Sequence, residues 1–500
     1  MLLIYPVEAA LRILPILAIP IIFGTREVNS LWLPIAGVVA ACVVAVIAGS
    51  IRWATTKYRI GPVYVELRRG VFQKKLLSVP RSRIRSVDVQ ARVLHRLLGM
   101  AKVSIGTGQQ SSGTWESNSF ELDALPAEVI PALRAELLAH ALAPPAPDSS
   151  LEWSTSTAVT TEPTSAPNTT ELAHWQWSWV RYAPFSLTGI VAIAAAVGAV
   201  FQFGLSEHLV DAEHLRDAAQ STAQLGLLIL VIIGAVGLLV TSSIVACVRY
   251  LVTFGKLHVN DTGRALNVSH GLLQTKQSTL DRARLRGTTL REPLLLRLAG
   301  GARLNAIMTG VSAETGHASL LMPQSPRVET RRVMAAVLHD EGLAQVPLRE
   351  HGPAARRRRY VRALSLPVAV LVAGLVIHMS VQPLPVLAWV AAVLVTAAAI
   401  WVAHDRYRGL GHAVAPGWLI TSSGSLDRSR DTLAAAGIIG WTVRQSFFQR
   451  RAGVATIVAA TPAGTGSYEV VDIPVDQAWA LVEAVTPGGG DVWINRGPAS

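Results

Sequence analysis

Residues 384–403 read LPVLAWVAAVLVTAAAIWVA, twenty consecutive positions without a charged side chain. A helix needs roughly 20 residues to cross a hydrocarbon core about 30 Å thick, so this run is long enough to span a membrane. Similar apolar runs recur at about 9–24, 31–50, 182–204, 223–247 and 361–377. Because the six runs come in three close pairs, they predict a polytopic α-helical membrane protein with six spans in three hairpins.

The composition agrees with this prediction, since 51% of the residues are hydrophobic and only 16% are charged. Core helices of a soluble protein are the alternative, but six paired apolar runs are hard to bury in water. The first run also resembles a secretory signal peptide. Glu8 beside Arg12, and the lack of a small-x-small cleavage site, favour a retained span instead.

The formal net charge of +12 is compatible with nucleic-acid binding, but the basic residues gather beside the ends of the apolar runs. They are Arg12, Arg52, Lys57, Arg59, Arg181, Arg249, Lys256, Arg356, Arg357, Arg358, Arg359, Arg362, Arg406 and Arg408. The opposite loops are poor in them, and residues 380–383 carry no charge. This asymmetry predicts a multi-pass protein of the bacterial cell membrane with all soluble parts in the cytoplasm and no nucleic-acid partner.

The soluble parts contain an internal repeat. One frame aligns Gly70 and Gly99 with Gly271 and Gly300 and with Gly424 and Gly453, and an arginine precedes each second glycine by three residues: Arg96, Arg297 and Arg450. Val65 and Leu67 alternate with polar residues, the period of a half-buried strand. Each copy closes with a helical pattern, such as Val333, Met334 and Val337. Each copy is therefore expected to be a small β-barrel or sandwich with a C-terminal helix.

The expected division of the chain follows from the spans, the repeat and the Pro-, Ser- and Thr-rich segment between the first two copies. It places membrane hairpins at 1–50, 176–250 and 361–404, repeated domains at 51–142, 251–345 and 405–487, a disordered linker at 143–175, a basic linker at 346–360 and a flexible tail at 488–500.

Two stretches resemble a known family: SVPRSRIRSV at 78–87 and LLGMAKVSIGTG at 97–108. They are similar to the bacterial pleckstrin-homology (PH)-like membrane proteins of the YdbS/YdbT type. The alternation of hairpin and domain resembles the longer, three-copy members over nearly the whole chain. The resemblance implies PH-like cytoplasmic domains with a C-terminal helix, no established activity, and a role in envelope physiology.

No catalytic, cofactor-binding or metal-binding constellation is found, so the chain is not expected to be an enzyme. Metalloprotease, Walker and nucleophile-elbow patterns are all absent. Cys42 and Cys247 both fall in apolar runs, which excludes a zinc cluster. The carboxylates Glu469 and Asp472 are expected as exposed charges.

The basic clusters give the functional clue, because each positive charge near an anionic leaflet contributes on the order of 1 kcal/mol of attraction. The candidate lipid-headgroup contacts are Arg81, Arg83, Arg85, Arg282, Arg284, Arg286, Arg356, Arg357, Arg358 and Arg359. A solvated strand face combined with a topology signal is the competing interpretation. The expected function is a non-enzymatic scaffold or regulator that binds membrane lipid or a protein partner at the inner leaflet. A component of a transport or export system is the alternative.

Overall fold

The computed structural model describes residues 57–61, 63–69, 75–81, 84, 86–91, 93–106, 120–126, 128–130, 132–133, 169–185, 223–310, 319–380 and 383–489, together with Val44 and Ile47. The chain divides into two compact units, and each is described here by itself. Unit 1 holds residues 1–169 and 261–281. Unit 2 holds residues 170–260 and 282–500.

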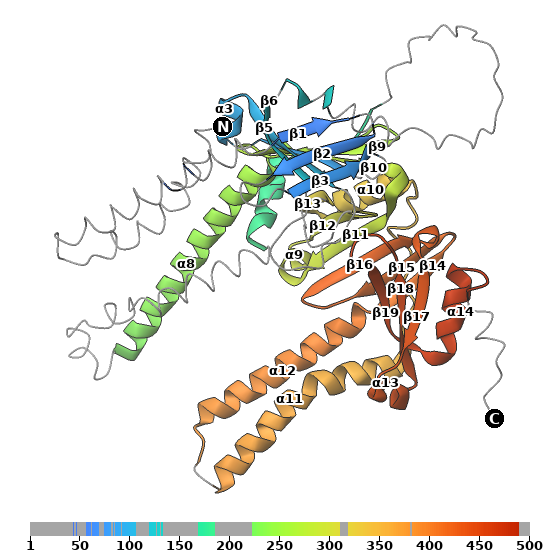
Figure 1. Ribbon diagram of the computed structural model, residues 1–500. Coiled ribbons are helices and arrows are strands. Elements are labelled where there is room, and N and C mark those ends of the chain that lie inside the picture. Colours follow the sequence, from blue (N-terminus) through green and yellow to red (C-terminus); the bar gives the residue numbers. More distant parts are fainter. Residues whose placement is uncertain are drawn as a thin grey trace, which may run out of the picture. The chain divides into compact units, whose positions relative to one another are not determined.

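One succession of elements occurs three times along the chain, and we call the three occurrences blocks 1, 2 and 3 (Figure 1). Block 1 contains β1 (Lys57–Ile60), β2 (Tyr64–Arg69), β3 (Lys75–Pro80), β4 (Ser86–Ala91), α3 (Val93–Leu97), β5 (Met100–Gly106) and β6 (Phe120–Pro126). Block 2 contains β8 (His258–Asp261), β9 (Ala265–His270), β10 (Thr275–Asp281), β11 (Leu285–Pro293), α9 (Leu294–Leu298), β12 (Gly301–Met308), β13 (Leu320–Pro326) and α10 (Arg327–Leu338). Block 3 contains β14 (Gly411–Ala415), β15 (Trp418–Ser423), β16 (Asp427–Ala434), β17 (Gly440–Arg444), α13 (Phe447–Ala452), β18 (Val454–Ala460), β19 (Ser467–Pro474) and α14 (Val475–Val485).

Short 3-10 turns precede the fourth strands of blocks 2 and 3, η5 (Arg282–Arg284) and η7 (Ala435–Gly437). The remaining elements lie between the blocks. They are β7 (Thr170–His174), the 3-10 helix η3 (Trp177–Phe185), α8 (Ala223–Phe254), α11 (Gly352–Ser380) and α12 (Val386–Arg408).

Unit 1 contains two antiparallel sheets, with strand orders β1-β2-β3 and β6-β5-β4-β10-β9. The alternation predicted from Val65 and Leu67 is found in β2, where both side chains are fully buried. They pack into one core with Ile84, Val87 and Val103. Removing such side chains from water contributes roughly 1.5–3 kcal/mol each, which is why the two sheets close on one another.

Unit 2 contains a six-stranded antiparallel sheet of order β13-β12-β11-β16-β15-β14 and a three-stranded sheet of order β17-β18-β19. The closing helices predicted from their apolar spacing are found as α10 and α14. Helix α10 buries Val333, Met334 and Val337, and α14 buries Val482 among the strands of block 3. Residues three and four apart share a helix face, so a single apolar stripe covers each end of the β-structure.

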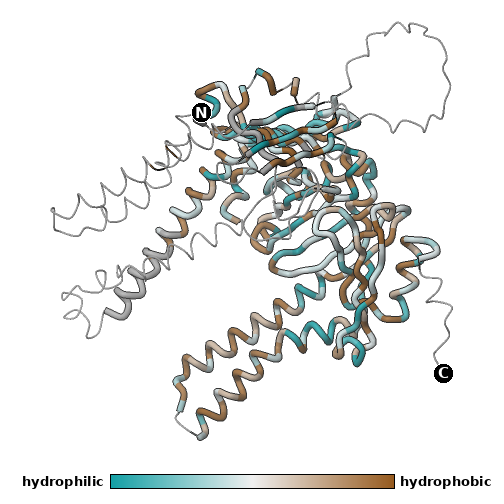
Figure 2. The backbone as a smooth tube through the Cα atoms, in the orientation of Figure 1, coloured by the Kyte–Doolittle hydropathy of each residue, from teal (hydrophilic) through white to brown (hydrophobic). Residues whose placement is uncertain are grey.

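Helices α11 and α12 form an antiparallel hairpin that protrudes from block 3 in unit 2 (Figure 1). Both are long and apolar enough to cross a membrane, and their apolar stretches are almost entirely unburied within the protein. Figure 2 shows the hairpin apolar along most of its length and polar where α11 enters the block. A soluble protein rarely exposes a continuous apolar surface of this size, so the hairpin indicates association with a membrane.

The prediction of a six-span polytopic membrane protein is wrong. In the described part of the chain, only the two helices of this hairpin are long and apolar enough to cross a membrane. The predicted span at 223–247 falls in α8, whose apolar stretch among the described side chains, Leu239–Phe254, is shorter than a span. The predicted spans at 9–24 and 31–50, apart from Val44 and Ile47, and at 182–204, apart from its first four residues, lie outside the described residues.

Apolar residues that suggested the second hairpin belong in part to a soluble core. Trp179 and Tyr182 of η3 are buried, and the Cys247 thiol of α8 lies 3.8 Å from the Val180 carbonyl oxygen. Tyr250, also in α8, is buried and donates a 2.6 Å hydrogen bond to the Gln324 carbonyl oxygen. Hydropathy alone cannot separate a helix that packs on its own protein from one that packs on lipid.

The expected domain boundaries also differ from the elements in two places. Strand β7 occupies Thr170–His174, inside the range expected as linker, whereas residues 143–168 lie outside the described residues. Helix α11 begins at Gly352, inside the range expected as a basic linker. The division of the chain into three hairpins and three domains therefore remains a prediction.

Candidate functional site

The α11–α12 hairpin is tied to block 3 by a buried carboxylate. Asp472 lies near the end of β19 and is fully buried. Arg358 donates to its Oδ1 atom, Arg359 lies 3.1 Å from Oδ2, and Gln449 of α13 donates to Oδ1 at 2.9 Å. Because a buried charge without a partner is strongly destabilising, the two arginines, which both belong to α11, hold that helix against the block.

A second carboxylate ties α12 to blocks 2 and 3. Asp405 accepts hydrogen bonds at 2.8 Å from Arg297 on both oxygens, and at 2.8 Å from the hydroxyl of Ser425. Arg428 of β16 donates to it at 3.0 Å. Charge-assisted hydrogen bonds of this kind are roughly twice as strong as neutral ones. The two carboxylates together fix both helices at the end of the hairpin that meets the soluble part.

A buried histidine pair lies beside this attachment. His351 Nε2 lies 2.8 Å from His412 Nδ1, and His351 Nδ1 donates to the Val471 carbonyl oxygen at 2.8 Å. Burial lowers the pKa of His412 to about 4, and the charges of His351 and Arg349 act in the same direction. The pKa of His351 is also lowered, chiefly by burial. Both rings are therefore neutral at neutral pH, with His412 as the donor between them.

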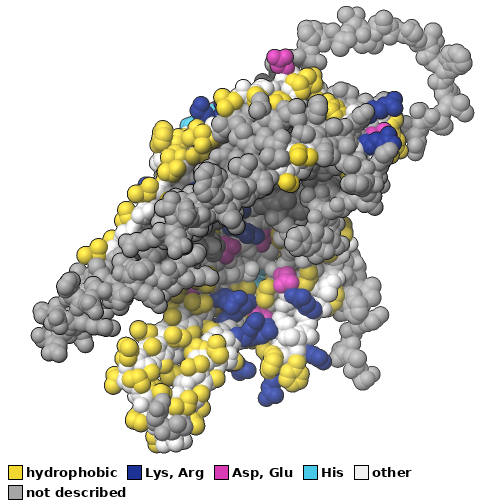
Figure 3. Space-filling model, turned by 60° about the vertical axis from the view of Figure 1, so that its left-hand side comes forward, with side chains coloured by type: hydrophobic (Ala, Val, Ile, Leu, Met, Phe, Trp, Pro, Cys, Tyr) yellow, Lys and Arg dark blue, Asp and Glu magenta, His cyan; other side chains and the backbone are white. Residues whose placement is uncertain are grey.

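Exposed cations and exposed apolar side chains share the same end of the hairpin. We call this set the hairpin base: Arg356, Arg357, Arg362, Arg406, Arg408, Leu298, Phe447 and Phe448. Phe447 and Phe448 are 68% and 72% exposed, on the short helix α13 that contacts α11. Leu298, 72% exposed, follows the Arg297 that binds Asp405. Figure 3 shows Lys and Arg side chains gathered where the apolar hairpin ends.

The ten arginines predicted as headgroup contacts have several different environments. Arg356 and Arg357 are exposed, whereas Arg358 and Arg359 are engaged by Asp472. Arg81 is buried. Arg83 and Arg85 lie outside the described residues.

The three arginines of block 2 are half-buried, and two of them have backbone partners in their own unit. Arg282 donates to the Val337 carbonyl oxygen at 2.7 Å, and Arg286 to the Ala283 carbonyl oxygen at 3.2 Å. Arg284, the third of these arginines, is also half-buried. Because backbone carbonyls already occupy two of these side chains, the exposed members of the predicted set are those at the start of α11.

The repeat positions have a common local role. Gly99, Gly300 and Gly453 each have a positive φ, between 63° and 78°, and each lies within two residues of the end of a short helix. Each amide donates to the carbonyl oxygen of the repeat arginine three residues earlier, at 3.0–3.2 Å. Gly271 and Gly424 also have positive φ, and a Cβ at either would lie about 2 Å from a backbone oxygen. Glycine is required at such positions, which explains the repeat frame. Gly70 lies outside the described residues.

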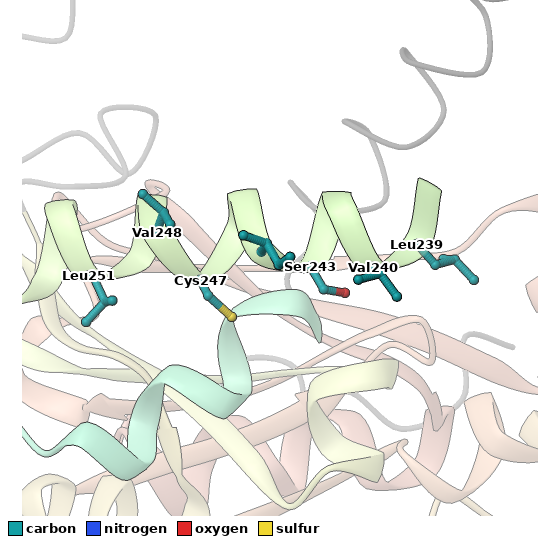
Figure 4. Close-up of a pocket in the computed structure, with 7 residues that line it drawn as sticks. Leu239, Val240, Ser243, Cys247, Val248 and Leu251 are labelled. Atoms are coloured by element: carbon teal, nitrogen blue, oxygen red, sulfur yellow. The ribbon is translucent and has the colours of Figure 1, made fainter. Parts of the chain in front are cut away.

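Helix α8 carries a shallow apolar groove of about 400 Å³ (Figure 4). Leu239, Val240, Ile244 and Val248 line it, and Cys247 points toward η3. Ser243 and Cys247 supply its few polar atoms, so the groove offers little for orienting a polar ligand. Within the described ranges, no three His, Cys, Asp or Glu side chains gather as a metal ion would require.

Sequence reasoning missed the two carboxylates that organise the site. Asp472 was expected as an exposed charge, but it is fully buried, which corrects that expectation. Asp405 lies in the segment AHDRYR after the last apolar run, where its neighbours suggest only a topology signal. The available signal was the excess of arginine itself. A run of four arginines at 356–359 entering a folded domain calls for a buried anion.

Comparison with known proteins gives one match. The family model of the bacterial PH domain matches residues 11–141 and 363–487, just over half of the chain. The chain belongs to the bacterial PH domain family. Neither a search of curated proteins nor a search of solved structures found a match. The two matched regions contain blocks 1 and 3, and the second includes most of the α11–α12 hairpin. Membership in this family indicates a module that binds lipid or protein.

Proposed function

We propose that this chain is a non-enzymatic, membrane-anchored PH-like scaffold of the longer, three-copy form. The α11–α12 hairpin crosses the cell membrane, and the hairpin base contacts anionic headgroups of the inner leaflet. The blocks then present binding surfaces to a protein partner in envelope physiology. Blocks 1–3 are the three PH-like domains of this proposal.

The hairpin base is the observation that carries the proposal. Two unburied apolar helices end where exposed arginines and exposed Phe447 and Phe448 begin. Aromatic side chains favour the level of the headgroups, and arginines there are attracted to anionic lipid. Asp472, which is buried, and Asp405, which is half-buried, keep the hairpin attached to the folded part, so the hairpin base keeps a fixed position along the membrane normal.

Transport has no comparable support in the described residues. In α11 and α12, all ionisable side chains lie near helix ends, and none lies between residues 363 and 377 or between 386 and 403. Transporters place such groups near the middle of the membrane. We therefore advance the binding function alone.

The test compares retained lipid in two matched variants of the full chain. Arg357→Gln with Arg362→Gln removes two exposed charges from the hairpin base, and Arg264→Gln with Arg444→Gln removes two exposed charges elsewhere. After extraction in mild detergent, mass spectrometry measures phosphatidylglycerol relative to phosphatidylethanolamine. Two charges correspond to roughly 2 kcal/mol, so we expect the first variant to lower phosphatidylglycerol affinity by about 30-fold.

The control variant should retain the wild-type lipid ratio. Equal ratios in the wild type and both variants would reject headgroup binding by the hairpin base. Equal losses in both variants would assign the effect to net charge and reject the site as well.

A further inference from the structure

Neighbouring blocks are joined by one repeated strand pairing. In unit 1, β4, the fourth strand of block 1, pairs antiparallel with β10, the third strand of block 2. In unit 2, β11, the fourth strand of block 2, pairs antiparallel with β16, the third strand of block 3. At both junctions, the fourth strand of one block therefore pairs with the third strand of the next block.

The register of the two pairings is the same. Ser86 lies opposite Leu280 in the first, and Gly287 lies opposite Leu433 in the second. In the glycine frame of the repeat, Gly287 takes the place of Ser86, and Leu433 takes the place of Leu280. Register in a sheet is set by which side chains face a core, so an identical register indicates one conserved mode of joining.

The fourth strand is covered only where this partner is present. Asp88 of β4 and Thr289 of β11 hold the same repeat position, and both are buried beneath the paired strand. Thr442 of β17 holds that position in block 3 and is exposed. Among the described strands, β17 pairs with β18 alone. Block 3 therefore has an open fourth-strand edge.

The third strand has the complementary pattern. Thr279 of β10 and Thr432 of β16 are buried, whereas Ser78 of β3, at the same repeat position, is exposed. Within the described part of the chain, β3 pairs only with β2. Unpaired edges of this kind are templates for another strand. The open edge of β17 belongs to a fourth strand and the open edge of β3 belongs to a third strand. These are the two strands that pair at the junctions between blocks.

We propose that β17 of one chain pairs antiparallel with β3 of a second copy of this chain. The repeated register places Gly440–Arg444 opposite residues 79 to 75, so all five residues of β17 have a partner within β3. Leu76, which is 65% exposed, then lies opposite Val443. These two apolar side chains supply a favourable cross-strand contact.

Two features of β3 and β17 that could oppose pairing lie at the ends of the ladder. Pro80 occupies the place of Asp281 and Ala434, and neither of those residues is paired across its block junction. Lys75 would face Arg444, whose charge is already paired with Glu469 at 2.6 Å. The ladder between them contains no proline and no other charge.

The repeat arginines point to the same junction. Arg96 of block 1 donates to the Leu272 carbonyl oxygen of block 2 at 2.8 Å, and Arg297 of block 2 binds Asp405, which leads into block 3. The Arg450 side chain of block 3 is exposed, and no hydrogen bond or ion pair joins that side chain to a described residue. A following block from a second chain would give it the partner that its two equivalents have.

Such an interface is heterologous, since different surfaces of the two chains meet. Repetition of a heterologous contact produces a closed ring or an open filament of chains. The membrane anchor would confine either assembly to two dimensions, and the sheet pairing would continue from chain to chain.

The test is disulfide cross-linking between differently tagged full-length chains in native membranes, with Cys42 and Cys247 changed to Ala. One chain carries Leu76→Cys and the other Val443→Cys. Residues directly opposite in antiparallel strands have Cβ atoms about 4.5–5.5 Å apart, close enough for a disulfide after oxidation. We expect a reducible band containing both tags.

The matched control pairs Leu76→Cys with Thr442→Cys. The side chain of residue 442 projects from the opposite face of the sheet, so we expect little cross-linked product.

Absence of the mixed band would overturn the proposal, as would an equally strong band in the control. Pairing of β3 and β17 within one chain would instead give a faster-migrating monomer in the double variant Leu76→Cys, Val443→Cys, and this too would overturn the proposal.

An independent measurement uses Leu76→Lys, which places a charge on the open edge without disturbing a core. Mass photometry in detergent should find wild-type oligomers and mainly single chains in this variant. The variant Val328→Lys, changed at another exposed apolar position, should keep the oligomers.

Discussion

At the scale of single residues, charge and burial compete most clearly at Asp472 and at the His351–His412 pair. Asp472 is fully buried, and two guanidinium groups and an amide surround it. The histidines are buried without a carboxylate in direct contact, so they remain neutral. Burial is therefore accompanied by paired cations at the carboxylate, and it favours the neutral form at the histidines.

Removal of the Asp472 charge should loosen the hairpin. The substitution Asp472→Asn leaves Arg358 and Arg359 without a counter-charge, which costs about 3–5 kcal/mol when the partners are buried. Glu469→Gln breaks an exposed pair with Arg444 and should cost less than about 1 kcal/mol. Thermal unfolding of the full chains in detergent measures both. Equal shifts in Tm would mean that Asp472 does not hold α11.

The histidine pair should make stability depend on acid. The pKa of His412 is about 4 in the folded chain and 6.5 in the unfolded chain, so the unfolded chain binds more protons between these pH values. Stability is then complete above about pH 6.5 and falls as the pH decreases toward 4, at roughly 1.4 kcal/mol per pH unit for one proton. His412→Gln should flatten the decline of Tm, and His258→Gln, at an exposed histidine, should not. An unchanged slope in His412→Gln would contradict this assignment.

At the scale of elements, the short helices α3, α9 and α13 share two features although their sequences differ. Each is followed within two residues by a glycine of positive φ, and each exposes a large apolar side chain, Leu97, Leu298 or Phe448. A helix this short is stabilised mainly by side chains that pack on the rest of the protein, and these exposed side chains do not. At α9 and α13 they lie beside the hairpin attachment, which fits a surface that meets lipid.

At the scale of the whole molecule, the proposed orientation places the soluble blocks on the cytoplasmic side. Cysteine labelling tests it on the full chain without Cys42 and Cys247. Leu426→Cys, at an exposed position of block 3, should react with a membrane-impermeant maleimide only after the cells are opened. Pro383→Cys, in the loop between α11 and α12, should react in intact cells if the hairpin crosses the membrane. Labelling of Leu426→Cys in intact cells would overturn the orientation.

The sequence by itself determined the features that depend on local chemistry. The α11–α12 hairpin follows from uninterrupted apolar runs, the turns from glycines that must adopt positive φ, and the strands and closing helices from their periods of 2 and 3.6. These properties need only a few neighbouring residues, so they can be predicted from one chain without a structure. The six-span prediction is wrong because, in the described part of the chain, only α11 and α12 are long and apolar enough to cross a membrane. Near its C-terminal end α8 contacts η3, a partner distant in the sequence, while many of its apolar side chains are exposed.

Only the tertiary structure decided which charges are free and how the blocks are joined. Arg357 and Arg358 are adjacent and chemically identical, yet one is exposed and the other is paired with Asp472, more than 100 residues away. Likewise β4, β11 and β17 share one repeat position, but in the described part of the chain only the first two are covered by a following third strand. Ion pairs and strand edges are completed by residues distant in the chain, and that long-range information is not contained in a local pattern.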